Sequence, residues 1–141
     1  MATKREQILE KIKSNLAGTV GVGTRIYRSR VEALTRSETP AIIIEPISDT
    51  PSDTQNFNNI VNHELKVNIS VVVRGSIPDK IADPTIESLH TKVLNDPSLG
   101  GIAIDIRPST TSFEILEADQ PAGVISCEFD IDYRTNYNSL T

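Results

Sequence analysis

The sequence predicts an α+β fold, in which one mostly antiparallel sheet carries two helices packed on one face. Three observations support this prediction. The chain has 141 residues, a common size for a single domain. Its 18 isoleucines and 10 valines outnumber the 9 leucines, and β-branched residues favour sheet. Finally, two segments with helical spacing of apolar residues stand among segments in which apolar and polar residues alternate.

Composition narrows the class of protein. Hydrophobic residues make up 38% and charged residues 23% of the chain, which excludes a disordered protein. No stretch approaches the roughly 20 apolar residues of a membrane span, and no signal peptide is expected at the N-terminus. A single cysteine, Cys127, cannot form an intramolecular disulfide, so we expect a reducing compartment. The net charge of −5 argues against a protein that grips nucleic acid.

Two helices are predicted. The first runs from Lys4 to Ala17, with Thr3 as its N-cap and Glu6 completing a capping box. The second runs from Pro84 to Asn95, with Asp83 as its cap and Pro84 at the first helical position. Apolar stripes give each helix a buried face: Ile8, Leu9, Ile12 and Leu16 in the first, and Ile86, Leu89, Val93 and Leu94 in the second.

Strands are predicted from β-branched runs and from alternation of apolar and polar residues. The predicted strands are Arg25–Arg30, Ala41–Glu45, Val61–Arg74, Ile102–Arg107, Phe113–Glu117 and Val124–Arg134. A short helical turn through Leu34, a turn over Gly75–Pro78 and a hairpin turn over Gln120–Gly123 connect some of them. We expect 48–59 to form a long polar surface loop and 135–141 to form a polar C-terminal arm.

An acidic row is predicted on the last strand. Glu128, Asp130 and Asp132 alternate with apolar residues, so their side chains share one face about 7 Å apart. Three like charges in a row require solvent or a partner. The row is therefore either a solvated outer face, an electronegative wall that lines a channel or meets a basic partner, or a metal-dependent nuclease site.

A basic cluster, Arg25, Arg28, Arg30 and Arg36, lies earlier in the chain beside Tyr27. Guanidinium groups are the favoured cations of protein interfaces, so contacts between subunits are the first interpretation. Solvent exposure and contact with DNA are the alternatives.

The sequence carries no catalytic signature. His63 and His90 lack metal-ligand spacing and are expected at the surface or at a sheet edge, while Cys127 is expected in the core. No phosphate loop or nucleophile elbow is present. We therefore predict a protein that is not an enzyme and that has no catalytic residues, cofactor or metal. A small metal-dependent hydrolase using the acidic row and His63 is the alternative from another class.

Several stretches resemble the tail terminator and related minor tail proteins of long-tailed bacteriophages. They are Tyr27–Leu34 leading into Thr39–Ile44, the stretch from Leu89 through Asn95 to Ala103, and Tyr133-Arg134-Thr135. The order and spacing of these stretches carry the resemblance, which extends over residues 1 to about 136.

The resemblance implies a homohexameric ring that sits on the last ring of the tail tube, stops its polymerisation and meets a head-side connector. Its implied partners are other copies of the chain, the tail tube protein and a head-completion protein, with phage DNA only in transit and no membrane. The implied location is the virion, after assembly in the host cytoplasm. A head-completion or stopper protein, one ring nearer the capsid, is the alternative within the same biology.

Overall fold

The computed structural model of the chain describes residues 2–30, 38–51, 59–116 and 121–141. Strands account for about 46% and helices for about 28% of the chain, so the predicted α+β class is confirmed. The elements are α1 (Lys4–Asn15), β1 (Ile26–Arg28), β2 (Ala41–Pro51), β3 (Ile60–Arg74), α2 (Pro78–Leu94), the short 3-10 turn η3 (Leu99–Gly101), β4 (Asp105–Leu116) and β5 (Ala122–Asn136).

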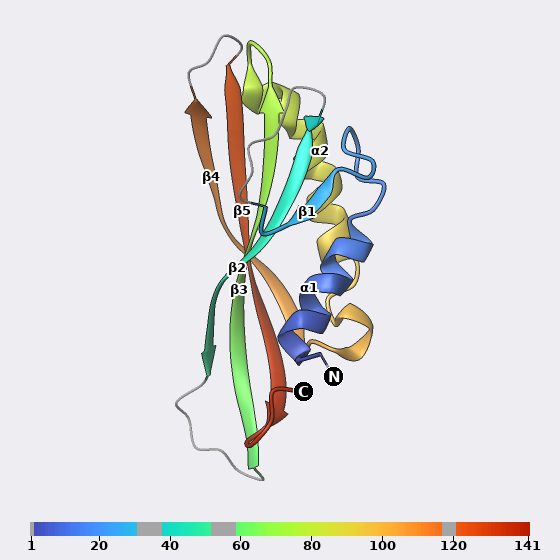
Figure 1. Cartoon of the computed structure of the whole chain (residues 1–141), viewed down its shortest axis with the longest axis vertical. Coiled ribbons are helices and arrows are strands. Elements are labelled where there is room, and N and C mark those ends of the chain that lie inside the picture. Colours follow the sequence, from blue (N-terminus) through green and yellow to red (C-terminus); the bar gives the residue numbers. More distant parts are fainter. Residues whose placement is uncertain (1, 31–37, 52–58, 117–120) are drawn as a thin grey trace.

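The five strands form one sheet in the order β1-β2-β3-β5-β4. β1 runs parallel to β2, and the other neighbouring strands are antiparallel, so the sheet is mixed with its parallel pair at one edge. Both helices cover the same side of the sheet, with α1 beside β1 and β2 and α2 beside β3 and β5 (Figure 1). The start of β3 and the end of β5 extend beyond the helices (Figure 1).

The core lies between the helices and the sheet. Alternation in the long strands sends one set of apolar residues to this side, which we call the helix-side face. All of them are buried: Leu65, Val67, Ile69, Val71 and Val73 from β3, and Ile125, Cys127, Phe129, Ile131 and Tyr133 from β5. Residues between them point to the other side, called the open face below.

Helix α1 begins as predicted. The Thr3 hydroxyl accepts a hydrogen bond from the backbone N–H of Glu6 at 3.1 Å, which is the first half of a capping box. The Glu6 side chain does not complete the box, because both of its carboxylate oxygens accept from Arg28 of β1. The residue expected to close the cap thus ties the helix to the sheet edge.

Helix α2 starts six residues earlier than predicted. Its N-cap is Ile77 and its first residue is Pro78, so Asp83 is not the cap and Pro84 lies inside the helix. Proline is favoured at the first position of a helix, so the sequence alone allows a helix to start at either Pro78 or Pro84. Packing decides between them, because Pro78 lies directly against Gly123 of β5. Within the helix, Leu89 and Val93 are buried as predicted, and Ile86 and Leu94 pack partly buried against the core.

Strand β2 continues into the segment that was predicted to be a loop. Ser48–Pro51 pair with His63–Lys66 of β3 after a register shift between Pro46 and Ser48. The prediction of a loop is wrong for 48–51, because β3 is long enough to supply hydrogen-bonding partners to a polar segment. Residues 52–58 of the predicted loop lie outside the described residues.

The two strands predicted over 102–117 form one strand, β4, which starts at Asp105 and shifts register between Pro108 and Thr111. Ile106 is buried, whereas Ile104 precedes the strand and is exposed. Pairing of Leu116 with Ala122 confirms a hairpin between β4 and β5. The predicted turn is misplaced, because Ala122 and Gly123 belong to β5; residue 120 lies outside the described residues. β1 is shorter than predicted, and the predicted turn through Leu34 extends into undescribed residues.

The C-terminal segment is not a free arm. Thr135 and Asn136 belong to β5, and Thr135 is buried. The backbone N–H of Tyr137 donates to the carbonyl of Asn59, and that of Lys4 donates to the carbonyl of Leu140. These bonds hold the last residues against the start of α1, so the two ends of the chain lie side by side (Figure 1).

Candidate functional site

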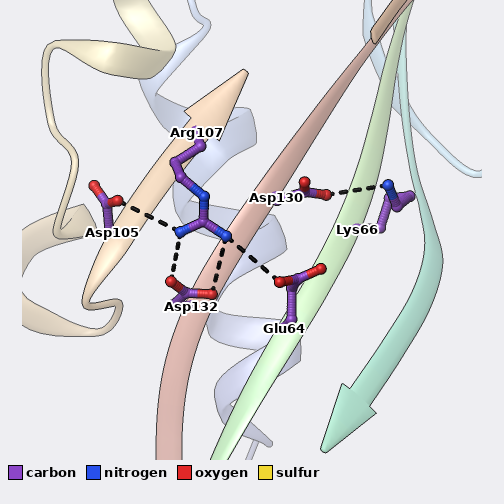
Figure 2. A network of polar contacts seen from close by, with 6 residues as sticks. All are labelled: Glu64, Lys66, Asp105, Arg107, Asp130 and Asp132. Atoms are coloured by element: carbon purple, nitrogen blue, oxygen red, sulfur yellow. Dashed lines mark hydrogen bonds and ion pairs between the residues drawn. The ribbon is translucent and has the colours of Figure 1, made fainter. Parts of the chain in front are cut away.

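The predicted acidic row lies on the open face of β5, and two of its three members are paired with cations from the neighbouring strands. Asp130 is 3.3 Å from the Lys66 ammonium of β3. Asp132 accepts hydrogen bonds from both terminal nitrogens of Arg107 of β4. Figure 2 shows these contacts crossing the three strands. Glu128 shares the face and takes part in no ion pair within the described part of the chain.

Arg107 is the centre of this network. Besides Asp132, it lies 3.5 Å from Asp105 on its own strand and 3.5 Å from Glu64 on β3 (Figure 2). Its hydrogen bond to Asp132 and the nearby negative charges raise the pKa of the guanidinium, so it stays protonated. Four carboxylates share two cations, Arg107 and Lys66, and the network therefore keeps a net charge of −2 to which Glu128 adds.

Small polar side chains occupy the middle of the open face. The Asn68 amide donates to the Ser70 hydroxyl at 3.0 Å and to the Glu45 carboxylate at 3.4 Å. Ser70 lies 3.4 Å from the hydroxyl of Ser126 on the next strand. These contacts link the polar side chains at the centre of this face, which presents a polar surface rather than an apolar one.

Two of the predicted arginines bind groups of their own chain. Arg25 donates to the backbone carbonyl of Pro40 at 2.8 Å and to that of Gly21 at 2.7 Å. Arg28 forms ion pairs with Glu6 at 3.0 Å and Glu10 at 2.6 Å, and its hydrogen bond to Glu6 lowers the pKa of that carboxyl. Arg28 thereby joins β1 to α1.

The third described arginine, Arg30, forms a bidentate pair with Glu38 at 2.7 and 3.2 Å. Its guanidinium also lies 4.6 Å from the centre of the Tyr27 ring. Arg36 lies outside the described residues. Contact of this cluster with another subunit stays a prediction, and the structure adds that the cluster also holds its own chain together.

A buried polar cluster at the end of the sheet was not found by sequence reasoning. Asp49 of β2 accepts a hydrogen bond from the hydroxyl of Tyr133 on β5 and one from Arg5 of α1 at 3.0 Å. His63 of β3 stacks on the Tyr133 ring with centroids 4.6 Å apart. Its Nδ1 lies 3.4 Å from Asp49, and its Nε2 lies 2.8 Å from the Thr135 hydroxyl. No local pattern could reveal the cluster, because its residues come from four elements.

The structure corrects the prediction for His63 and confirms the predictions for His90 and Cys127. His63 is not a surface residue, since its side chain is only 9% exposed within the cluster, whereas His90 is exposed on α2 as expected. Burial and the hydrogen bond to Asp49 raise the pKa of Tyr133, so its hydroxyl acts as a donor. Cys127 is a core residue as predicted, and burial raises the pKa of its thiol.

The structure does not bring His63 together with the acidic row. His63 is on the helix-side face, whereas Glu128, Asp130 and Asp132 are on the open face. Over residues 2–30, 38–51, 59–116 and 121–141, no three His, Cys, Asp or Glu side chains are grouped closely enough to hold a metal ion. In the same ranges, no helix is both long enough and apolar enough to cross a membrane.

No protein-family model matches the sequence, and no curated protein matches it. The fold and the surfaces described above therefore carry the functional argument together with the resemblance noted in the sequence.

Proposed function

We propose that this chain is a structural protein of a bacteriophage virion, forming a homohexameric ring that ends the tail tube and joins it to the head-side connector. The observation that carries the proposal is the open face of the sheet. It is wide, polar and net negative, and its charged side chains are held in place by contacts across β3, β5 and β4.

Such a face suits the wall of a channel through which DNA passes. A net negative surface repels phosphates, so it guides the duplex without binding it. Pairing of Asp130 with Lys66 and of Asp132 with Arg107 fixes the positions of the carboxylates, while the excess negative charge persists. A wall of unpaired cations would instead retain the DNA.

The shape of the chain offers further support. Beyond the helices, the start of β3 and the end of β5 project as a narrow extension of the sheet (Figure 1). An extension of this kind can reach an adjacent ring, either the tail tube protein or the head-completion protein. The resemblance in the sequence favours the terminator position over the stopper position. The hydrolase alternative loses support, because its histidine and its carboxylates lie on opposite faces.

The proposal is tested by the mass of the purified chain in solution and by negative-stain images, alone and with purified tail tubes. We expect six-membered rings and capped tube ends. A chain that stays monomeric and leaves tube ends bare contradicts the proposal. Rings that bind head-side connectors but ignore tube ends would favour the stopper position.

A further inference from the structure

Two apolar surfaces lie at opposite edges of the sheet. The first, which we call the β4 surface, consists of Pro78, Phe113 and Ile115, with Asp79 and Glu114 at its rim. Phe113 and Ile115 are 65% and 62% exposed, so both side chains project from the edge strand. Phe113 is one of only three phenylalanines in the chain. Large apolar groups exposed together at a sheet edge mark an interaction surface.

The second surface, which we call the β1 hollow, lies at the other edge, between the end of α1 and β1. It is an open hollow of about 360 Å³ lined by Lys13, Ala17, Gly18, Gly23, Thr24 and Ile26. Among the described residues, nothing lies within 4 Å of a Cβ built on Gly18 or Gly23, so these residues leave the space above the glycines open. A cavity of about 150 Å³ is large enough for a benzene ring, so a phenyl group fits here.

The two surfaces complement each other in charge. The rim of the β4 surface carries two carboxylates, Asp79 and Glu114, whereas the charged residue of the β1 hollow is Lys13. Within the described part of the chain, none of these three takes part in an ion pair. Each surface thus has an apolar centre and a charge of the sign that the other needs.

We infer that the partner of the β4 surface is a second copy of this chain, whose β1 hollow receives Phe113 and places Lys13 beside Glu114. Because the two surfaces are different and lie at opposite edges, each copy keeps one of each free for the next copy. Contacts of this heterologous kind propagate from copy to copy and form a ring when the rotation closes. The inference rests on the proposed function and names the surfaces that would build its ring.

The first test replaces Phe113→Asp and measures association of the full chain by sedimentation velocity and mass photometry. Loss of an aromatic anchor is expected to weaken association roughly tenfold or more. The matched control is Ile47→Asp, which places the same charge at an exposed isoleucine on β2, outside both surfaces, and should leave association unchanged. Circular dichroism and thermal melting check that each variant remains folded.

The second test reverses charges without removing apolar contacts. Lys13→Glu and Glu114→Lys should each weaken association, because each puts like charges beside one another at every contact. The double variant, K13E with E114K, restores opposite charges at every contact and should recover most of the association. Recovery by the double variant requires the two residues to face each other across copies.

The outcomes separate this inference from the proposed function. Rings that cap tube ends in the wild type and persist in F113D overturn the inference but leave the function standing. If the wild type is monomeric and its binding to tubes depends on Phe113, the β4 surface binds the tube protein, and the inference is also overturned. If the wild type neither associates nor binds tubes, both the inference and the proposed function fail. Loss of rings in F113D with recovery in the double charge reversal supports the inference.

Discussion

Arg107 of β4 donates through both terminal nitrogens to the carboxylate of Asp132 on β5. This pair relieves a conflict in the sheet, since Asp132 lies directly opposite Asp105 in the register of the two strands. Like charges in directly opposed positions destabilise a sheet, and Arg107 contacts both of them. Arg107 therefore offsets the repulsion between these two carboxylates at the junction of β4 and β5.

Replacing Arg107→Ala should lower the free energy of unfolding by about 0.5–1 kcal/mol, the range of exposed ion pairs, because it leaves Asp105 and Asp132 facing each other. Urea titrations at low salt and in about 1 M salt should show the difference shrinking as ions screen the repulsion. Arg134→Ala is the control, because the Arg134 side chain donates to the neutral Asn62. An R107A defect that is equal at both salt concentrations would contradict the electrostatic explanation.

Replacing Tyr133→Phe removes the hydroxyl that donates to Asp49 in the buried cluster. The ring can still stack on His63, so the loss is that of one hydrogen bond to a buried carboxylate, about 1–3 kcal/mol. Chemical unfolding of the wild type and Y133F at neutral pH measures this loss of unfolding free energy. Tyr137→Phe, at an exposed tyrosine, should change stability little.

The same variant should alter how stability depends on alkaline pH. Burial raises the pKa of Tyr133 in the folded chain above its ordinary value near 10. Above pH 10 the unfolded chain releases this proton while the folded chain keeps it, so the stability contributed by the neutral phenol declines as pH rises. Unfolding curves from pH 9 to 11 should therefore fall more steeply for the wild type than for Y133F. Parallel curves would show that Tyr133 does not titrate in this way.

Replacing Gly123→Ala should destabilise the chain. An added Cβ would lie 2.4 Å from the Cβ of Pro78, which is part of a rigid ring at the start of α2. Relief of that clash requires α2 to move, at about 1–3 kcal/mol for an overpacked contact. Thermal unfolding provides the measurement, with Ser112→Ala on the exposed part of β4 as a control. A stability equal to the wild type would mean that the start of α2 is free to shift.

Replacing Glu128→Lys probes the proposed lumen. This carboxylate has no ion-pair partner in the described chain, so its reversal should leave folding and ring formation intact while slowing DNA passage during packaging or ejection. Asp130→Lys differs, because it sets a second ammonium beside Lys66 and should also reduce stability. If E128K rings fail to form, Glu128 belongs to a subunit contact rather than to the channel wall.

Local patterns were sufficient to predict the fold class, the start of α1 and the two faces of β3 and β5. Thr3 caps the first helix through a bond to a residue three positions on. Alternation in β3 and β5 determines which side chains can be buried together, because successive residues of a strand point to opposite faces. The position of Glu128, Asp130 and Asp132 on the open face follows from the same alternation.

The surroundings of those residues depend on contacts between distant segments. Lys66 and Arg107 neutralise much of the acidic row, yet they lie on other strands whose register the sequence pattern does not state. The buried cluster of Asp49, His63 and Tyr133 was missed for the same reason, since polar residues in a strand carry no local sign of a buried partner.

By itself, the sequence determined that the chain is an α+β protein with one apolar and one polar face to its main strands, because hydrophobic periodicity is a local property. Tertiary structure decided where β2 ends and where α2 begins. Ser48–Pro51 became strand because β3 supplied their partners, and α2 starts at Pro78 because that ring packs on Gly123. Local propensity is weak at such boundaries, so the free energy of pairing and packing sets them.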